Sequence, residues 1–223
     1  MKKVYKMNAF TFAEVLLTLI VIGVVSVLTV PTLRNHAEEA KFVAATQKAM
    51  SEIAAATTNV ELAHGDASMW NFGSAQTVEW YKEVMNVIPV PQNELTWKRY
   101  TLGNQRSNFP ASFITADGMA WSIGTGGYSC GGGVGLVDVN GPEPPNTIGI
   151  DMHGFRIGHL CSGNGHKSKS GEFGIYAMGD MKNDINTEWG CTSYVIKHKK
   201  MPWLYNPPVL SDGQSGCQPY SGK

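Results

Sequence analysis

The first half of this 223-residue chain contains no cysteine and little glycine. The four cysteines lie in the second half, and 22 of the 25 glycines lie at Gly103 or later. No two cysteines form a CxxC pair, which gives no support to a zinc ribbon or a thioredoxin-type site. Net charge is also absent, with 18 basic against 18 acidic residues, so the composition does not indicate a nucleic-acid partner. No GxSxG, HExxH or closely spaced acid pair stands in a context typical of a hydrolase, and we expect no enzymatic activity.

A long apolar run near the N-terminus is present instead. Residues 10–30 carry one formal charge, Glu14, and three lysines precede them. A helix of this length spans about 31 Å, close to the hydrocarbon thickness of a bilayer. The run is too long for a secretory signal peptide, and no A-x-A site follows it. It therefore predicts a transmembrane helix with its lysine-bearing end in the cytoplasm and the rest of the chain outside.

Glu14 does not fit a plain membrane anchor. A carboxylate inside a membrane helix costs a few kcal/mol or more, and such a group is usually paired. Cleavage between Ala9 and Phe10 would create a free amine about one turn from Glu14, in the same subunit or a neighbouring one. The two charges would then neutralise each other in apolar surroundings.

These residues resemble a known family. Phe10, Thr11 and Glu14, a basic leader and a proline at position 22 of the cleaved chain (Pro31) match the cleavage and N-methylation motif of type IV pilins and type II secretion pseudopilins. The family usually has glycine where this chain has Ala9. The resemblance implies that a prepilin peptidase cuts before Phe10 and methylates the new amine. It also implies that Glu14 pairs with the N-terminus of an adjacent subunit during assembly.

The chain then divides into four parts: a leader (1–9), a transmembrane and assembly helix (10–30), the exposed half of the same helix (31–66) and a glycine-rich head (67–223). Pro31 predicts a bend within the helix, and Gly65 predicts its C-terminal cap. One apolar stripe predicts the face of the exposed half that packs against the head: Phe42, Ala49, Ile53, Ala56 and Val60.

The sequence of the head predicts short strands separated by turn dipeptides such as Asp117-Gly118. This pattern predicts an α+β fold with a pilin-like layout, in which the long helix packs on a small antiparallel sheet. A shorter helix is expected within residues 69–90. Strands are expected at 111–115, 120–123, 135–139, 155–157, 173–177 and 192–197.

An even number of cysteines behind a membrane segment favours two disulfides over free thiols. The residues are Cys130, Cys161, Cys191 and Cys217, and three pairings are possible. We favour Cys130–Cys161 and Cys191–Cys217, the second of which would close a C-terminal loop as in many pilins. Zinc binding near Cys161 by His159 and His166 would lack a fourth ligand.

The loop from Asp138 to Asp151 is the most chemically suggestive part of the head. Asp138, Asn140 and Asp151 could supply hard oxygen ligands for Ca²⁺. The loop is similar to one in bacterial pilin-like proteins, and some pseudopilins bind calcium in a loop of the head. The alternative is a structural loop whose Asp and Asn side chains bond their own backbone.

We therefore expect a structural subunit of a filament anchored in the bacterial inner membrane, and the resemblance favours a type II secretion pseudopilin. Its partners would be prepilin peptidase and other pilin or pseudopilin subunits, in a filament that is periplasmic or at the cell surface. The alternative is a type IV pilus subunit or a minor tip pilin acting in adhesion or DNA uptake. No basic aromatic stripe is present, and the cluster His198-Lys199-Lys200 near Trp203 is small. No cofactor is required, and Ca²⁺ is the one candidate.

Overall fold

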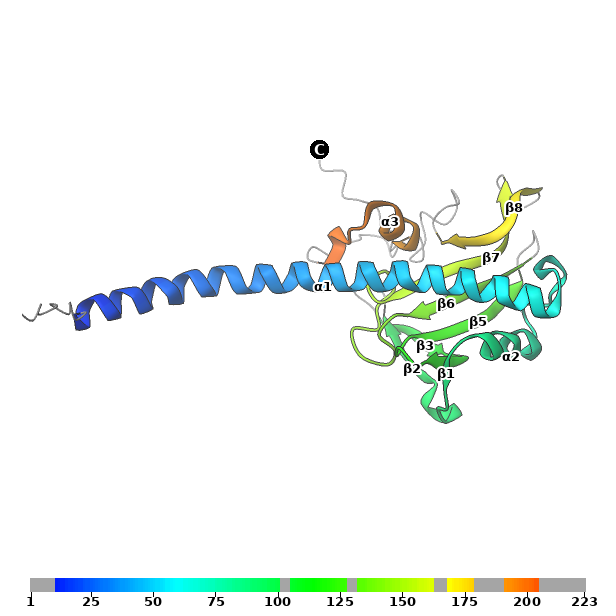
Figure 1. The fold of residues 1–223 in the computed structure, drawn as a ribbon, viewed down its shortest axis with the longest axis horizontal. Helices are drawn as coiled ribbons and strands as arrows, with labels where there is room; N and C mark the ends of the chain where they lie inside the picture. Colours follow the sequence, from blue (N-terminus) through cyan, green and yellow to red (C-terminus); the bar gives the residue numbers. More distant parts are fainter. Residues whose placement is uncertain (1–10, 101–104, 128–131, 163–167, 179–190, 205–223) are drawn as a thin grey trace, which may run out of the picture. The chain divides into compact units, whose positions relative to one another are not determined.

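The computed structural model describes residues 11–100, 105–127, 132–162, 168–178 and 191–204. These form an α+β structure with a long N-terminal helix and a six-stranded antiparallel sheet (Figure 1). The chain forms two compact units, residues 1–38 and 39–223. The helices are α1 (Phe12–His64), α2 (Ala75–Val84) and α3 (Cys191–His198), with 3₁₀ turns η1 (Ala67–Met69), η2 (Gln92–Glu94) and η4 (Pro202–Leu204).

Helix α1 has 53 residues, which corresponds to about 80 Å, and it continues through Pro31. It ends where the sequence predicts. Gly65 has a φ of +88°, in the left-handed region that glycine adopts without steric cost, and its N–H donates to the carbonyl of Glu61 at 2.9 Å.

The predicted stripe on α1 is confirmed within the second unit. All five side chains are less than 9% exposed, and Ile53 and Val60 are fully buried. They join a cluster with residues of the sheet that includes Trp121 and Phe155. This part of α1 lies along one face of the sheet (Figure 1).

The sheet has the strand order β1-β4-β5-β6-β7-β8, and every neighbouring pair is antiparallel. The predicted turn at Asp117-Gly118 joins β4 to β5: Gly118 has a φ of +89° and its N–H donates to the Thr115 carbonyl at 2.8 Å. The strands are β1 (Val87–Ile88), β4 (Phe113–Thr115), β5 (Ala120–Gly127), β6 (Gly132–Asp138), β7 (Met152–Ser162) and β8 (Ser168–Ala177).

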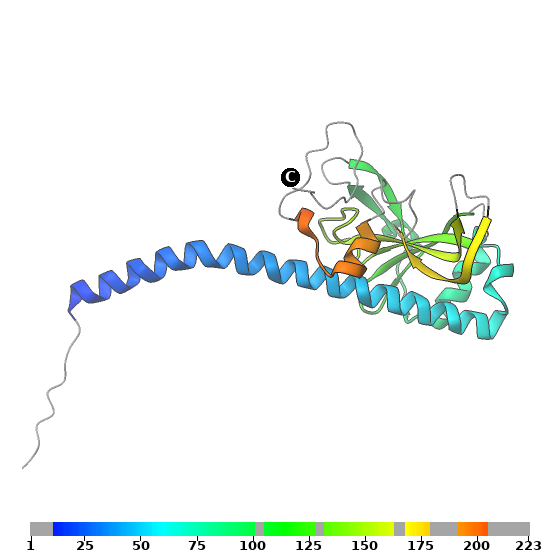
Figure 2. The same ribbon diagram turned by 90° about the horizontal axis from the view of Figure 1, so that it is seen from above.

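A separate hairpin of β2 (Thr96–Tyr100) and β3 (Gln105–Pro110) covers the other face of the sheet (Figure 2). Side chains alternate between the two faces of a strand. Trp121 and Val137 therefore join the cluster under α1, whereas Ala120 and Leu136 join a second cluster under the hairpin. The sheet is thus buried on both faces, which the sequence did not predict.

Two glycines of β6 leave room for aromatic rings. A Cβ on Gly133 would lie 2.5 Å from the Cβ of Phe72, and one on Gly135 would lie 2.2 Å from the ring of Phe155. Such distances are far below van der Waals contact. Glycine is therefore needed at these two positions because only a residue without a side chain leaves space for the rings.

The strand predicted at 192–197 is wrong, because these residues belong to helix α3. β-branched residues such as Val195 suggested a strand. Cys191 and Val195, four positions apart, are both buried, and the rings of Tyr194 and His198 lie 4.3 Å apart. Burial of this i, i+4 face outweighs the weak strand preference of the segment.

Candidate functional site

The first turn of α1 holds Glu14 in a reciprocal hydrogen-bond arrangement with Thr11. The Thr11 backbone N–H donates to Glu14 Oε2 at 2.8 Å, and the Thr11 hydroxyl donates to the same oxygen at 2.9 Å. The Glu14 N–H in turn donates to Thr11 Oγ1 at 3.3 Å. This is a capping box, and the sequence signal for it is a Thr followed three residues later by Glu before an apolar run. This cap was not predicted from the sequence. It gives Glu14 a local structural role besides any pairing between subunits.

The helix after this turn exposes apolar side chains on all sides of the first unit. From Phe12 to Leu33 its large hydrophobic residues are between 43% and 79% exposed. Within the described residues, α1 is the helix long and apolar enough to cross a membrane. A surface of this kind requires lipid or protein to cover it.

Several predicted site residues lie outside the described part of the chain: Ala9 and Phe10 at the cleavage site, together with Cys130, His166 and Cys217. Cys191, at the start of α3, is disulfide-bonded. The two favoured disulfides, Cys130–Cys161 and Cys191–Cys217, stay predictions. Cys161 and His159 lie in β7, where the backbone alone is described.

The predicted calcium loop connects β6 to β7 and places two carboxylates in the interior. Asp138 and Asp151 are both fully buried. Trp97 of the hairpin donates from Nε1 to Asp138 Oδ2 at 2.9 Å. The two oxygens of Asp151 accept the backbone N–H groups of Asn146 (2.7 Å) and Thr147 (2.6 Å). Asp151 therefore holds the loop backbone, as in the structural alternative.

The burial of these carboxylates changes their protonation. Burial, and then the nearby charge of Asp151, raises the pKa of Asp138 to about 9. Burial raises the pKa of Asp151 to about 6, against the lowering effect of the Thr147 and Asn146 N–H groups. Asp138 therefore keeps its proton at pH 7 unless a bound cation displaces that proton.

Three buried oxygens of this loop have no hydrogen-bond partner among the described residues: Asp138 Oδ1, Asn140 Oδ1 and Asn146 Oδ1. The Asn140 and Asn146 amides donate instead to backbone carbonyls, Asn140 to Glu143 at 2.8 Å and Asn146 to Pro142 at 3.1 Å. An acceptor buried without a partner is costly, and a cation or a proton would satisfy it. These three oxygens are therefore the candidate ligands for a hard cation, with Asn146 in place of Asp151.

Asn146 was not among the predicted ligands. Its φ of +48° is rare for a residue other than glycine, and the Pro-Pro-Asn-Thr sequence around it was read only as a loop. Asn is one of the few side chains that tolerate this backbone conformation, which is the signal that could have singled it out.

Comparison of the chain with protein-family models, with curated proteins and with solved structures gave no match.

Proposed function

We propose that this chain is the subunit of a pilus-like filament anchored in the bacterial inner membrane, as its resemblance to pseudopilins implies. The observation that carries the proposal is an apolar helix exposed on all sides whose first turn contains a single carboxylate. Lipid covers such a surface before assembly, and neighbouring subunits cover it afterwards. The second half of the same helix packs against the head, so the head and the assembly segment share one continuous helix.

The capping box makes it possible to separate two roles of Glu14. Glutamine at this position can also complete a capping box, but it carries no charge. Pairing with the amine of a processed neighbour requires the charge, so Glu14→Gln should insert into the membrane and fail to assemble. Membrane extraction measures insertion, and electron microscopy of cells expressing tagged protein measures assembly.

Thr11→Ala is the matched control because it keeps the charge and removes the hydroxyl of the capping box. It should weaken the start of the helix by about 1 kcal/mol and still assemble. If Glu14→Gln assembles like the wild type while Glu14→Ala does not, helix capping is the only role of Glu14 and the pairing is wrong.

N-terminal sequencing of the mature protein should find Phe10 as the first residue, methylated on its amine.

We favour a secretion pseudopilus over a type IV pilus or a minor tip pilin. Where the tagged protein is found decides between them. Long filaments on the cell surface would favour the pilus, and a periplasmic location would favour the secretion system.

A second proposal is that the β6–β7 loop binds Ca²⁺. The three partnerless oxygens favour it, with Asp138, Asn140 and Asn146 as ligands. The bound ion would neutralise Asp138 and attach the loop to the head. Asp151 would keep its two backbone hydrogen bonds and position the loop without binding the ion.

Titration calorimetry of the full chain in detergent with CaCl₂ tests this. We expect saturable heat and a higher melting temperature, since a ligand that binds only the folded state stabilises it. Asp138→Asn should abolish both, whereas Asp66→Asn, a change at the cap of η1, should abolish neither. No heat and no shift in melting temperature would refute the proposal.

A further inference from the structure

A groove on the head, unrelated to the acidic loop, lies between α1, the end of α2 and the β4–β5 turn. Its volume is about 320 Å³, within the range of small binding sites. Ala55, Val84 and Met85 give it apolar walls, and Asn59 and Asn86 add two side-chain amides. All of these residues belong to the second unit.

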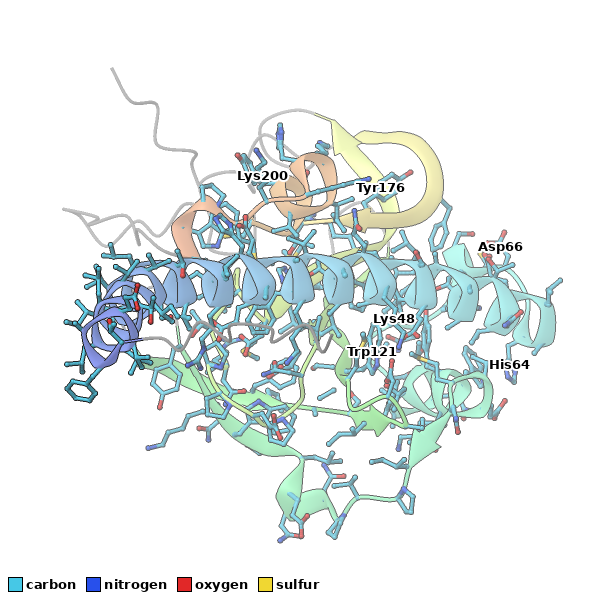
Figure 3. All side chains as sticks on the ribbon, turned by 60° about the vertical axis from the view of Figure 1, so that its left-hand side comes forward. Lys48, His64, Asp66, Trp121, Tyr176 and Lys200 are labelled. Atoms are coloured by element: carbon cyan, nitrogen blue, oxygen red, sulfur yellow. The ribbon has the colours of Figure 1, made fainter. Side chains whose placement is uncertain are left out.

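The wall of the groove nearest the turn carries an ion pair between distant parts of the chain. Lys48 of α1 places its Nζ 2.6 Å from Asp117 Oδ2. The Thr115 hydroxyl donates to Asp117 Oδ1 at 2.6 Å and accepts the indole N–H of the buried Trp121 at 3.1 Å. Figure 3 shows the two ends of this chain of bonds, Lys48 on α1 and Trp121 in the sheet. The position of Asp117 is therefore fixed from both sides.

Glu52 shares the same ammonium but lies farther from it. Its Oε1 is 3.4 Å from Lys48 Nζ, against 2.6 Å for Asp117. One ammonium and two carboxylates leave the groove with a net charge of −1, and Glu52 is the carboxylate with the weaker partner. Its side chain is 35% exposed. Burial, and then the charge of Asp117, raise the pKa of the Glu52 carboxyl, against the lowering effect of Lys48.

The chemistry of the groove selects its ligand. An apolar wall beside a carboxylate suits an alkyl chain that ends in a cation. The Asn59 and Asn86 oxygens add neutral acceptors, and a guanidinium with five N–H donors can use more of them than an ammonium. The Lys48 and Glu52 side chains of the groove are 51% and 35% exposed, so the groove would enclose a free small cation poorly but can receive a side chain from a chain lying across it.

We propose that this groove binds an arginine side chain of a partner polypeptide, with the guanidinium at Glu52 and the alkyl stem over Val84 and Met85. The Lys48–Asp117 pair fixes the wall of the groove and does not bind the ligand. This site is independent of the proposed filament role, because none of its residues lies in the transmembrane segment.

Methyl NMR of the full chain in detergent, labelled at methionine, tests the proposal with N-acetyl-arginine methylamide as the probe. Met85→Leu identifies the Met85 signal by its loss. We expect a saturable shift of that signal with the arginine probe and none with the citrulline analogue, which has the same shape without the charge. Glu52→Gln should weaken binding about tenfold or more, the factor expected for loss of a charge-assisted contact.

Glu83→Gln is the matched control, since Glu83 lies on α2, bonds His64 at 2.8 Å and does not line the groove. It should leave the affinity unchanged. An equal response to citrulline, no shift at Met85, or unchanged binding by a folded Glu52→Gln variant would overturn the proposal. Tighter binding of putrescine than of the arginine probe would identify a free cation as the ligand and overturn the assignment to a polypeptide.

Discussion

Asp138 is fully buried, and the Trp97 indole N–H donates to its carboxyl group at 2.9 Å. Its pKa of about 9 lies far above the 3.8 of an ordinary aspartate. The folded protein thus keeps a proton that the unfolded chain releases above about pH 4. Asp138 therefore lowers the stability of the metal-free protein as the pH rises toward 9.

Asp138 dominates the change in stability from pH 7 to 9, and the His153 side chain of the unfolded chain, with a pKa near 6.5, adds a small slope of opposite sign close to pH 7. Burial lowers the pKa of His153 to about 4 and raises that of Asp151 to about 6, so both residues have completed their titration in the folded state by pH 7. We expect the free energy of unfolding to fall with pH in this window by up to about 1.4 kcal/mol per pH unit. Urea unfolding of the full chain in detergent and chelator at pH 7, 8 and 9 measures it.

Asp138→Asn should remove most of this slope, because the amide cannot ionise and its oxygen can still accept from Trp97. Asp66→Asn, an exposed aspartate at the cap of η1, should leave the slope unchanged. A wild-type slope that persists in Asp138→Asn would place the titrating group elsewhere.

At the scale of elements, strand β6 depends on the absence of side chains at two positions. The Phe155 ring occupies the space that a Cβ on Gly135 would need. Phe155 is fully buried and packs edge-on against Trp121, with ring centroids 6.0 Å apart, so neither ring can move away easily. Gly135→Ala should lower the free energy of unfolding by about 1–3 kcal/mol, the usual cost of overpacking.

Gly73→Ala is the control for that measurement. A Cβ there would contact only Asn71 Oδ1, at 3.6 Å, and Gly73 is not among the glycines with positive φ. We expect it to change the free energy of unfolding by less than about 0.5 kcal/mol. Denaturant unfolding of both variants against the wild type gives the comparison, and equal effects would mean that the packing around β6 adjusts freely to the added methyl group.

Elements with a local signal were predictable from the sequence, and elements set by distant contacts were not. The stripe on α1, the cap at Gly65 and the Asp117-Gly118 turn depend on neighbouring residues alone. Helix α3 depends instead on burial against the rest of the head. In the acidic loop, the sequence identified Asp138 but could not distinguish the roles of Asp151 and Asn146, because that distinction depends on which oxygens the backbone N–H groups already occupy.

At the scale of the whole molecule, the two units divide one continuous helix. The cluster of buried residues under α1 begins at Phe42, and the Met201 N–H donates to Glu39 Oε1 at 2.7 Å. The head therefore takes its interactions from residue 39 onward. We expect a fragment of residues 39–223, expressed with its disulfides, to be soluble and to unfold cooperatively on heating.

A fragment of residues 45–223 is the matched comparison, because it lacks Glu39, Phe42 and Val43. Phe42 and Val43 are 8% and 7% exposed, so removing them should lower the free energy of unfolding by several kcal/mol, about the cost of large core truncations. Circular dichroism and thermal denaturation measure both fragments. If the longer fragment aggregates or unfolds without a cooperative transition, the head needs the apolar half of α1 to fold. The division of the helix into an assembly segment and a packing face would then be wrong.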